Sequence, residues 1–285
     1  IPVAGQPLDY KMDFPDCMMP ISQNYTLIEH AVYECAMAGC ETIWIICNDD
    51  VAPIIRYRIG DYIEDPVYVS RMAKFPSEHK TQIPIFYAPI HPKDRDKRDC
   101  LSWSVIHGAL VALKITTQIS KWTAPNKYYV SFPYGVFPVE ELREHRTKIS
   151  STTNFYMMFG GKTVEDNYYC SFTFGVPEFI KYRKNIRKKG TGMYTTEVVD
   201  ERGIPRSKLP IEKRYSARFF DLKEVFTDLD IESSNCFEPS SFNNIGSWEE
   251  YRAFMGSPLS AQIRRPWEGI MRYREFNPVG VDPKQ

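Results

Sequence analysis

Hydrophobic segments of two kinds alternate along the first half of the chain. After the strand-like residues 1–4, apolar residues recur at helical spacing, and we expect this helix to begin after an N-cap at Asn24 and to end at Gly39. The continuous apolar run 42–47 that follows is typical of a strand buried on both faces of a parallel sheet. Together these segments predict a βαβ unit with a right-handed crossover.

The same alternation continues toward the middle of the chain. The pattern predicts further helices over 51–63, 103–115 and 139–142, and further strands over 83–87 and 127–132. Alternating strands and helices indicate an α/β sheet with helices on both faces. Ligands of such sheets bind in the crevice beyond the carboxyl ends of the strands. We therefore expect residues 5–20, 48–50 and 133–135 to surround one site.

After about residue 150 the segments become aromatic and β-prone. Residues 155–159 and 168–174 suggest added, antiparallel strands around a helix over 177–188, and the last thirty residues read as a packed tail or an interaction arm. We therefore predict one α/β domain over 1–255, divided into a nucleotide-binding half (1–150) and an elaborated acceptor half (151–255), with a C-terminal tail over 256–285.

Composition and charge narrow the function classes. The 36 Lys and Arg residues balance 36 Asp and Glu residues, which argues against a generally basic nucleic-acid coat protein. The longest apolar run, 43–47, is far below the about 20 residues that a membrane helix needs, so we expect no membrane partner. Seven cysteines without a CxxC pair predict buried free thiols and a cytoplasmic protein. Because the chain opens at Ile1 rather than Met, we also expect residues before it.

Several motifs follow one another in a familiar order. They are Gly5, Pro15, Pro20-Ile21, Leu27-Ile28-Glu29-His30, Ala38-Gly39-Cys40-Glu41-Thr42-Ile43, Leu101–Ala109, Val130–Phe137 and Phe242–Tyr251. In order and spacing this series resembles the sugar-nucleotide pyrophosphorylases, also called sugar-phosphate nucleotidyltransferases. The resemblance implies a three-layer α/β fold of the nucleotide-diphospho-sugar transferase type, GT-A-like and Rossmann-like, with a mostly parallel central sheet and an elaborated C-terminal half.

The resemblance also implies an activity and a site. Such enzymes transfer a nucleotide from a nucleoside triphosphate to a sugar phosphate, with Mg²⁺ and basic side chains neutralising the phosphates. We accordingly expect a nucleotide or nucleotide-sugar ligand, a possible Mg²⁺ cofactor and a possible homo-oligomer. The nucleotide-binding positions implied here are Ala4, Gly5, Gln6, Ser102, Trp103, Ser104, Tyr134 and Gly135.

The catalytic positions depart from the family pattern. The loop after Gly5 lacks the second glycine and the arginine, Asp16 stands where the family has a lysine, and Tyr134 and Asn244 stand where it has two metal-binding aspartates. Lys11 is a candidate substitute cation, although a solvated loop lysine fits its acidic neighbours as well. Asn244 is a candidate weak metal ligand or a hydrogen-bonded turn residue.

Two further groups of charged residues leave alternatives open. Asp49 and Asp50 follow a predicted strand and are candidate metal ligands, or else they stabilise the start of the next helix. The basic run Lys181–Lys189 is a candidate nucleic-acid surface, although a solvated helix face is favoured. The sequence therefore supports three hypotheses: a divergent nucleotidyltransferase, a glycosyltransferase that consumes a nucleotide sugar, and a non-catalytic pseudoenzyme with a binding or assembly role.

Overall fold

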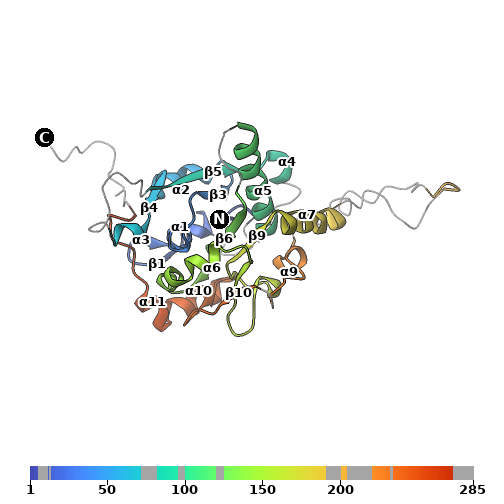
Figure 1. The fold of residues 1–285 in the computed structure, drawn as a ribbon. Coiled ribbons are helices and arrows are strands. Elements are labelled where there is room, and N and C mark those ends of the chain that lie inside the picture. Colours follow the sequence, from blue (N-terminus) through green and yellow to red (C-terminus); the bar gives the residue numbers. More distant parts are fainter. Residues whose placement is uncertain are drawn as a thin grey trace.

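The computed structural model is a mixed α/β protein (Figure 1) and describes residues 1–5, 12, 14–71, 82–95, 100–119, 125–190, 200–203, 220–231 and 234–271. The strands are β1 Pro20–Ser22, β2 Tyr25–Thr26, β3 Ile43–Cys47, β4 Tyr62–Glu64, β5 Gln82–Pro89, β6 Lys127–Val130, β7 Gly135–Val136, β8 Phe155–Met157, β9 Phe172–Gly175, β10 Asn235–Phe237 and β11 Asn243–Asn244. The α-helices are α1 Leu27–Ala38, α2 Ala52–Ile59, α3 Pro66–Val69, α4 Pro92–Arg95, α5 Leu101–Lys114, α6 Arg146–Ser150, α7 Val176–Gly190, α9 Leu222–Val225, α10 Trp248–Met255 and α11 Pro258–Gln262. Short 3₁₀-helices lie at Asp16–Met18, Val139–His145 and Val164–Asp166, and a π-helix at Ile115–Ile119 extends α5.

The predicted βαβ unit is present at the N-terminus. The segment 1–4 lies parallel to β3, where the Val3 amide donates to the Ile46 carbonyl at 2.8 Å and the Ile46 amide donates to the Ile1 carbonyl at 2.9 Å. Helix α1 ends at Gly39 as expected, in a left-handed conformation with φ 87°. The predicted N-cap at Asn24 is wrong, because Thr26 caps the helix in a capping box with Glu29.

The predicted helix over 51–63 also ends too late. Helix α2 stops at Ile59, Gly60 reverses the chain, and the following residues form β4, which pairs antiparallel with β5. Parallel pairing joins β3 to β5 and β8 to β10, while β8–β9 and β6–β9 are antiparallel. The antiparallel strands predicted for the second half of the chain are therefore confirmed, and the described ladders form mixed sheets.

The second sheet consists of β10, β8, β9 and β6, in this order. An aromatic core fills the space between this sheet and helix α7. Phe172 of β9 lies 5.0 Å from Phe226 between ring centroids, and Tyr182 of α7 lies 5.0 Å from the same ring in an edge-to-face arrangement. Each such pair contributes about 0.5–1.5 kcal/mol beyond its buried area. The seven cysteines are all free, as predicted, and five of them are buried. Among the described residues, no helix combines the length and the apolar character needed to cross a membrane.

The residues predicted to form a C-terminal tail belong in part to the folded body. Helix α11 packs against β1, and the backbone carbonyl of Ile270 accepts a hydrogen bond from the Glu64 amide at 3.0 Å. The remaining residues 272–285 lie outside the described part of the chain. The domain boundaries at residues 150 and 255 stay predictions.

One buried carboxyl group links α1 to the second sheet. Glu34 is fully buried, and its oxygens accept hydrogen bonds from the hydroxyls of Tyr129 at 2.7 Å, Ser131 at 2.6 Å and Ser171. Burial raises the pKa of the Glu34 carboxyl to about 7, and the three hydroxyl donors partly oppose this rise. The side chain therefore exchanges a proton near neutral pH while it remains inside the protein.

We predict that Glu34 makes the protein less stable as the pH rises. Because its pKa is higher in the folded protein than in the unfolded chain, folding binds a proton between about pH 4.5 and about pH 7, and the stabilisation is lost as the pH rises through the folded pKa. We expect Glu34→Gln to gain on the order of 3 kcal/mol relative to the natural protein across this interval. Urea unfolding of both proteins at several pH values measures this difference.

The comparison with the variant isolates Glu34 from other titrating groups. Burial lowers the pKa of His30 to about 3, which acts in the opposite direction in the same pH interval, but this contribution is common to both proteins. A stability difference between the two proteins that stays constant with pH would show that Glu34 does not titrate there.

Candidate functional site

The end of the N-terminal strand packs directly against the backbone at the start of helix α5. Gly5 has φ 81°, and a Cβ atom there would lie 2.3 Å from the Cys100 backbone nitrogen. The Ser104 hydroxyl donates a hydrogen bond to the Ala4 carbonyl at 2.6 Å and so fixes the strand end to the helix. Only glycine permits this approach without displacing the backbone. The contact fixes the end of the N-terminal strand, up to Gly5, against the start of α5.

Three predicted nucleotide-binding side chains belong to the interior. Ser102 and Ser104 are fully buried, and the Ser102 hydroxyl donates to the Phe220 carbonyl at 3.1 Å. Trp103 is also buried, with its ring 6.3 Å from that of His107. In the described part of the chain the two hydroxyls therefore hold backbone segments together at the start of α5.

The two positions that the resemblance assigns to metal ligands, Tyr134 and Asn244, lie close together. Asn244 of β11 pairs with Gly135 of β7, directly after Tyr134. The Tyr134 ring is fully buried 5.5 Å from the Tyr169 ring, and the Asn244 side-chain oxygen accepts a hydrogen bond from the Tyr169 amide at 2.8 Å. At Gly135 a Cβ atom would lie 2.2 Å from the Tyr169 carbonyl oxygen. These residues thus join three segments by packing and hydrogen bonding.

Asp49 and Asp50 follow β3, as predicted, and both have protein partners. The Asp49 carboxylate lies 3.2 Å from the guanidinium of Arg95, and the Asp50 carboxylate accepts from the Val51 amide at 3.1 Å. The second contact agrees with a role at the helix start. Among the described residues, no group of three His, Cys, Asp or Glu side chains could hold a metal ion. Gln6 and Lys11 lie outside the described residues.

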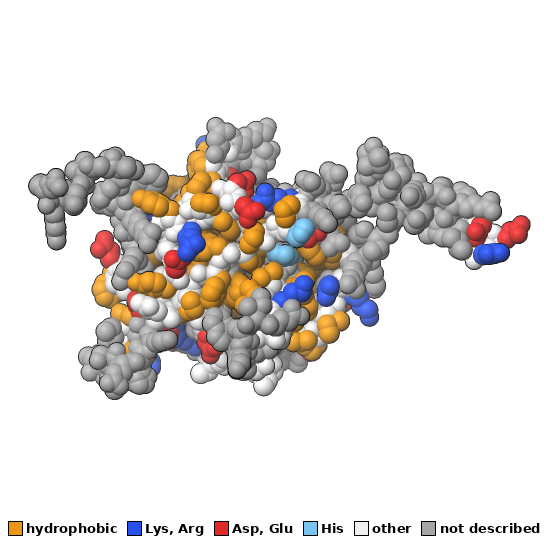
Figure 2. Space-filling view, turned by 90° about the horizontal axis from the view of Figure 1, so that it is seen from above, with side chains coloured by type: hydrophobic (Ala, Val, Ile, Leu, Met, Phe, Trp, Pro, Cys, Tyr) orange, Lys and Arg blue, Asp and Glu red, His pale blue; other side chains and the backbone are white. Residues whose placement is uncertain are grey.

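A cavity of about 570 Å³ opens beside these strand ends. It lies between α5 and the strands β3 and β5, and it is lined by Trp44, Asp49, Phe86, Tyr87, Ala88, Pro89, Ile90, His91, Pro92, His107, Val111 and Ile115. The rings of Trp44 and Phe86 stack with centroids 4.7 Å apart. Figure 2 shows hydrophobic side chains gathered on the face seen from above, with histidine side chains among them. The size suits a small-molecule ligand.

The cavity has an apolar end and a polar end. Val111 and Ile115 from α5 and the stacked Trp44–Phe86 pair supply apolar surface, whereas His91, His107 and Asp49 supply polar groups. His107 forms a hydrogen bond between its Nε2 atom and the Pro89 carbonyl at 3.0 Å, which fixes its ring. Burial raises the pKa of the neighbouring Cys47 thiol to about 12, so this thiol is neutral and not a nucleophile.

Sequence reasoning missed the aromatic lining of this cavity. Trp44 and Phe86 are register partners on adjacent parallel strands, so their side chains project from the same face. The alternation of side chains within each strand indicates which residues share a face. Only the register between the two strands shows that Trp44 and Phe86 lie side by side.

The basic run Lys181–Lys189 lies on helix α7. Tyr182, the aromatic residue within it, is buried in the core, and Lys181 lies 3.5 Å from the Asp228 carboxylate. Asn185 donates to the Val225 carbonyl at 3.0 Å. This face of the helix is therefore packed against the protein, so Tyr182 cannot stack on a nucleic-acid base. These contacts agree with the interpretation of the run as a helix with a solvated face.

Solved structures of sugar nucleotidyltransferases align with most of this chain. A Bacillus anthracis protein assigned as a glucose-1-phosphate thymidylyltransferase, solved with sucrose, aligns over 91% of this chain and 93% of its own at 9% identity and a TM-score of 0.53. A UDP-glucose pyrophosphorylase from Acinetobacter baumannii aligns over 92% and 95% at 13% identity and a TM-score of 0.48. A nucleoside-diphosphate-sugar pyrophosphorylase from Vibrio cholerae aligns over 87% and 93% at 12% identity and a TM-score of 0.42.

The structural likeness to the Bacillus anthracis protein establishes the class of fold. The chain has a nucleotidyltransferase-like α/β fold, as the motif order in the sequence predicted. No protein-family profile matches the sequence, and no curated protein matches it at the sequence level. At this level of identity the likeness concerns the fold alone, and function has to be argued from the site.

We predict that Gly5→Ala destabilises the protein by about 3 kcal/mol, because the methyl group meets the Cys100 backbone and the left-handed φ is strained. Gly161→Ala is the matched control, since Gly161 has φ 74° and nothing within 4 Å of an added Cβ. We expect the control to cost about 1 kcal/mol from φ strain alone. Urea denaturation measures both, and equal losses would contradict the close approach of Gly5 to α5.

Proposed function

We propose that this chain binds a nucleoside triphosphate or a nucleotide sugar at the carboxyl ends of β3 and β5, as a divergent nucleotidyltransferase. The observation that carries the proposal is the Gly5 contact with Cys100, reinforced by the hydrogen bond from Ser104 to Ala4. It holds the end of the N-terminal strand where ligands bind in α/β sheets. The adjoining cavity along α5 offers the stacked Trp44 and Phe86 rings and a polar end.

In the proposed reaction an oxygen of a sugar phosphate attacks the α-phosphorus of the triphosphate. The new phosphorus–oxygen bond forms as the bond to the β-phosphate oxygen breaks, and pyrophosphate leaves with that electron pair. The protein's contribution to such a step is positioning and charge neutralisation. Arg95, which contacts Asp49 at the cavity, is one candidate for neutralising the phosphate charge. Lys11, which follows Gly5 in the sequence, is the other.

The residues at the two family metal positions do not fit Mg²⁺. The Tyr134 ring is buried, and the Asn244 oxygen is occupied by the Tyr169 amide. The Asp49 carboxylate, at the end of β3, faces Arg95. Mg²⁺ prefers carboxylate, phosphate and water oxygens in octahedral geometry, and these side chains do not offer such a set.

A second candidate function is ligand binding without transfer. It is favoured by the replacement of both metal positions by residues that serve packing, Tyr134 and Asn244. The glycosyltransferase hypothesis is less favoured, because Asp49 and Asp50 would have to bind its metal and both carboxylates already have partners. A homo-oligomeric state and a cytoplasmic location remain predictions.

We predict that a nucleotide ligand raises the melting temperature of the protein. The panel is UTP, dTTP, ATP and UDP-glucose, each with and without Mg²⁺, because a ligand at about a hundred times its Kd adds about 2.7 kcal/mol. Val111→Trp fills the cavity beside α5 and should abolish the shift, whereas Val176→Trp at an exposed position of α7 should preserve it. The measurement is differential scanning fluorimetry.

A coupled assay for pyrophosphate separates the two candidate functions. Release of pyrophosphate from the stabilising triphosphate, dependent on glucose 1-phosphate, supports transfer, whereas a melting shift without release supports binding alone. If none of the panel shifts the melting temperature, or if Val111→Trp leaves the shift intact, the proposed binding site is wrong.

A further inference from the structure

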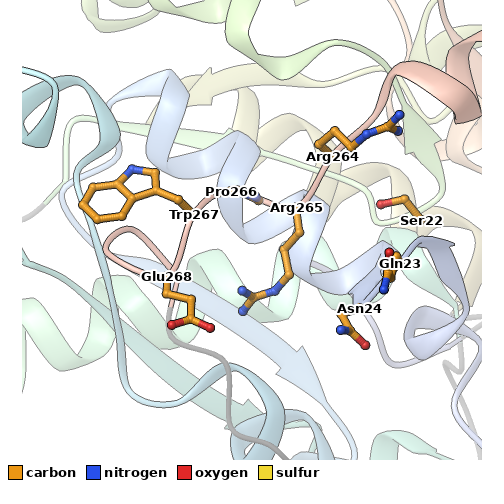
Figure 3. Close-up of a pocket in the computed structure, with 8 residues that line it drawn as sticks. All are labelled: Ser22, Gln23, Asn24, Arg264, Arg265, Pro266, Trp267 and Glu268. Atoms are coloured by element: carbon orange, nitrogen blue, oxygen red, sulfur yellow. The ribbon is translucent and has the colours of Figure 1, made fainter.

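Both ends of helix α1 are held by arginines from distant parts of the chain. At its start, Arg265 from the segment that follows α11 (Figure 3) lies 3.4 Å from the buried Glu29 carboxylate. At its end, Arg146 of α6 donates through Nε to the Met37 carbonyl at 2.9 Å, and it also donates to the Ala36 carbonyl. These contacts fix both ends of the helix to the rest of the protein.

The chain leaves α1 through a Schellman turn. Gly39 has the left-handed φ of 87°, and its amide donates to the Ala36 carbonyl at 3.2 Å. The Cys40 amide donates to the Cys35 carbonyl at 3.1 Å. This pair of hydrogen bonds is the arrangement in which the residue after the glycine contacts the residue that begins the last helical turn. In this protein both of those positions are cysteines.

The two cysteine side chains interact with each other. The Cys35 thiol donates a hydrogen bond to the Cys40 sulfur, and this contact together with burial raises the pKa of the Cys35 thiol well above its usual value. Cys35 is only 4% exposed, whereas Cys40 is partly exposed. Small reagents in solution therefore reach Cys40 first, and Cys35 lies directly behind it. Both residues are free thiols in the structure.

We propose that Cys35 and Cys40 form a reversible disulfide bridge when the protein meets a low-molecular-weight disulfide such as glutathione disulfide. The Cys40 sulfur attacks one sulfur of the reagent, a mixed disulfide forms, and one glutathione leaves with the electron pair of the broken bond. Cys35 then attacks the Cys40 sulfur and releases the second glutathione in the same way. The two thiol protons end on the released glutathiones. Two protein thiols are thus oxidised to one disulfide, and one reagent disulfide is reduced to two thiols.

The folded turn favours the bridge more than the unfolded chain does. A disulfide joins residues whose Cα atoms are about 4.4–6.8 Å apart, and the Cys40 amide already reaches the Cys35 carbonyl. Because the turn and Arg146 hold both residues in place, closing the bridge removes little backbone freedom from the folded protein. The unfolded chain loses more entropy when the same loop closes. The bridge is therefore more stable in the folded protein.

The cysteine pair is separate from the cavity beside α5. Cys40 precedes β3, whereas Asp49, which lines that cavity, follows the other end of the strand. The bridge consequently does not depend on nucleotide binding, and its test needs no ligand of that cavity.

A single proteolytic peptide reports on the pair. Cleavage after Glu34 and Glu41 by a glutamate-specific protease releases the peptide 35–41, which contains both cysteines and no other. The full chain is equilibrated with glutathione and glutathione disulfide, quenched with acid, alkylated with N-ethylmaleimide and digested. We expect mass spectrometry to show that most of this peptide carries neither an alkyl group nor glutathione. Prior treatment with dithiothreitol should restore two alkylated cysteines.

Two variants identify the partners of the bridge. Cys40→Ser should leave Cys35 as a free thiol that is alkylated after the quench. Cys236→Ser is the matched control, because Cys236 is the other partly exposed cysteine and its sulfur contacts the Ile231 carbonyl at 3.6 Å. This control should leave the bridge in peptide 35–41 intact.

The unfolded chain distinguishes the folded turn from mere closeness in sequence. In the same glutathione buffer, we expect the ratio of bridged to reduced peptide to be at least about tenfold higher for the native protein than for the protein unfolded in urea. Equal ratios would overturn the role of the turn. A native peptide that stays alkylated at both cysteines at every glutathione ratio, or that carries glutathione without a bridge, would overturn the proposal.

Discussion

The contact between Gly5 and the first turn of α5 is the constraint on which the candidate site depends. It joins the N-terminal strand, which is hydrogen-bonded to β3, to the helix that follows β5. Because the two backbones touch, the side chains around them are packed, and Ser102 and Ser104 donate to backbone carbonyls rather than to solvent. Ligand-accessible space consequently lies farther along α5, beside Trp44 and Phe86.

Local signals in the sequence predicted the elements whose ends are determined locally. Gly39 ends α1 because the left-handed turn there favours glycine, and the apolar run 43–47 is a buried strand. Two errors have tertiary causes. Residues 60–64 have helix-compatible spacing but pair with β5, and Asn24 lies in a turn held by Arg58, so that Thr26 becomes the cap.

The candidate site was predictable in position but not in the state of its side chains. Motif order singled out Tyr134 and Asn244, and the structure brings them close together, because Asn244 of β11 pairs with Gly135, the residue after Tyr134. Whether they face a ligand depends on Tyr169, which is remote in sequence. Its ring packs against the Tyr134 ring, and its amide donates a hydrogen bond to the Asn244 side-chain oxygen. No local pattern around any of the three residues encodes that arrangement. With a packed ring at Tyr134 and a hydrogen-bonded amide at Asn244, this part of the protein buries no charge at these two positions.

Buried charge is instead concentrated around Glu29 in the first turn of α1. Glu29 is buried because it serves three segments at once: it completes the cap of α1, contacts Arg58 of α2 and contacts Arg265 after α11. A carboxylate held by two guanidinium groups is compensated, so the protein can bury it without an unpaired charge. The same ion cluster therefore fastens the segment after α11 to the start of α1.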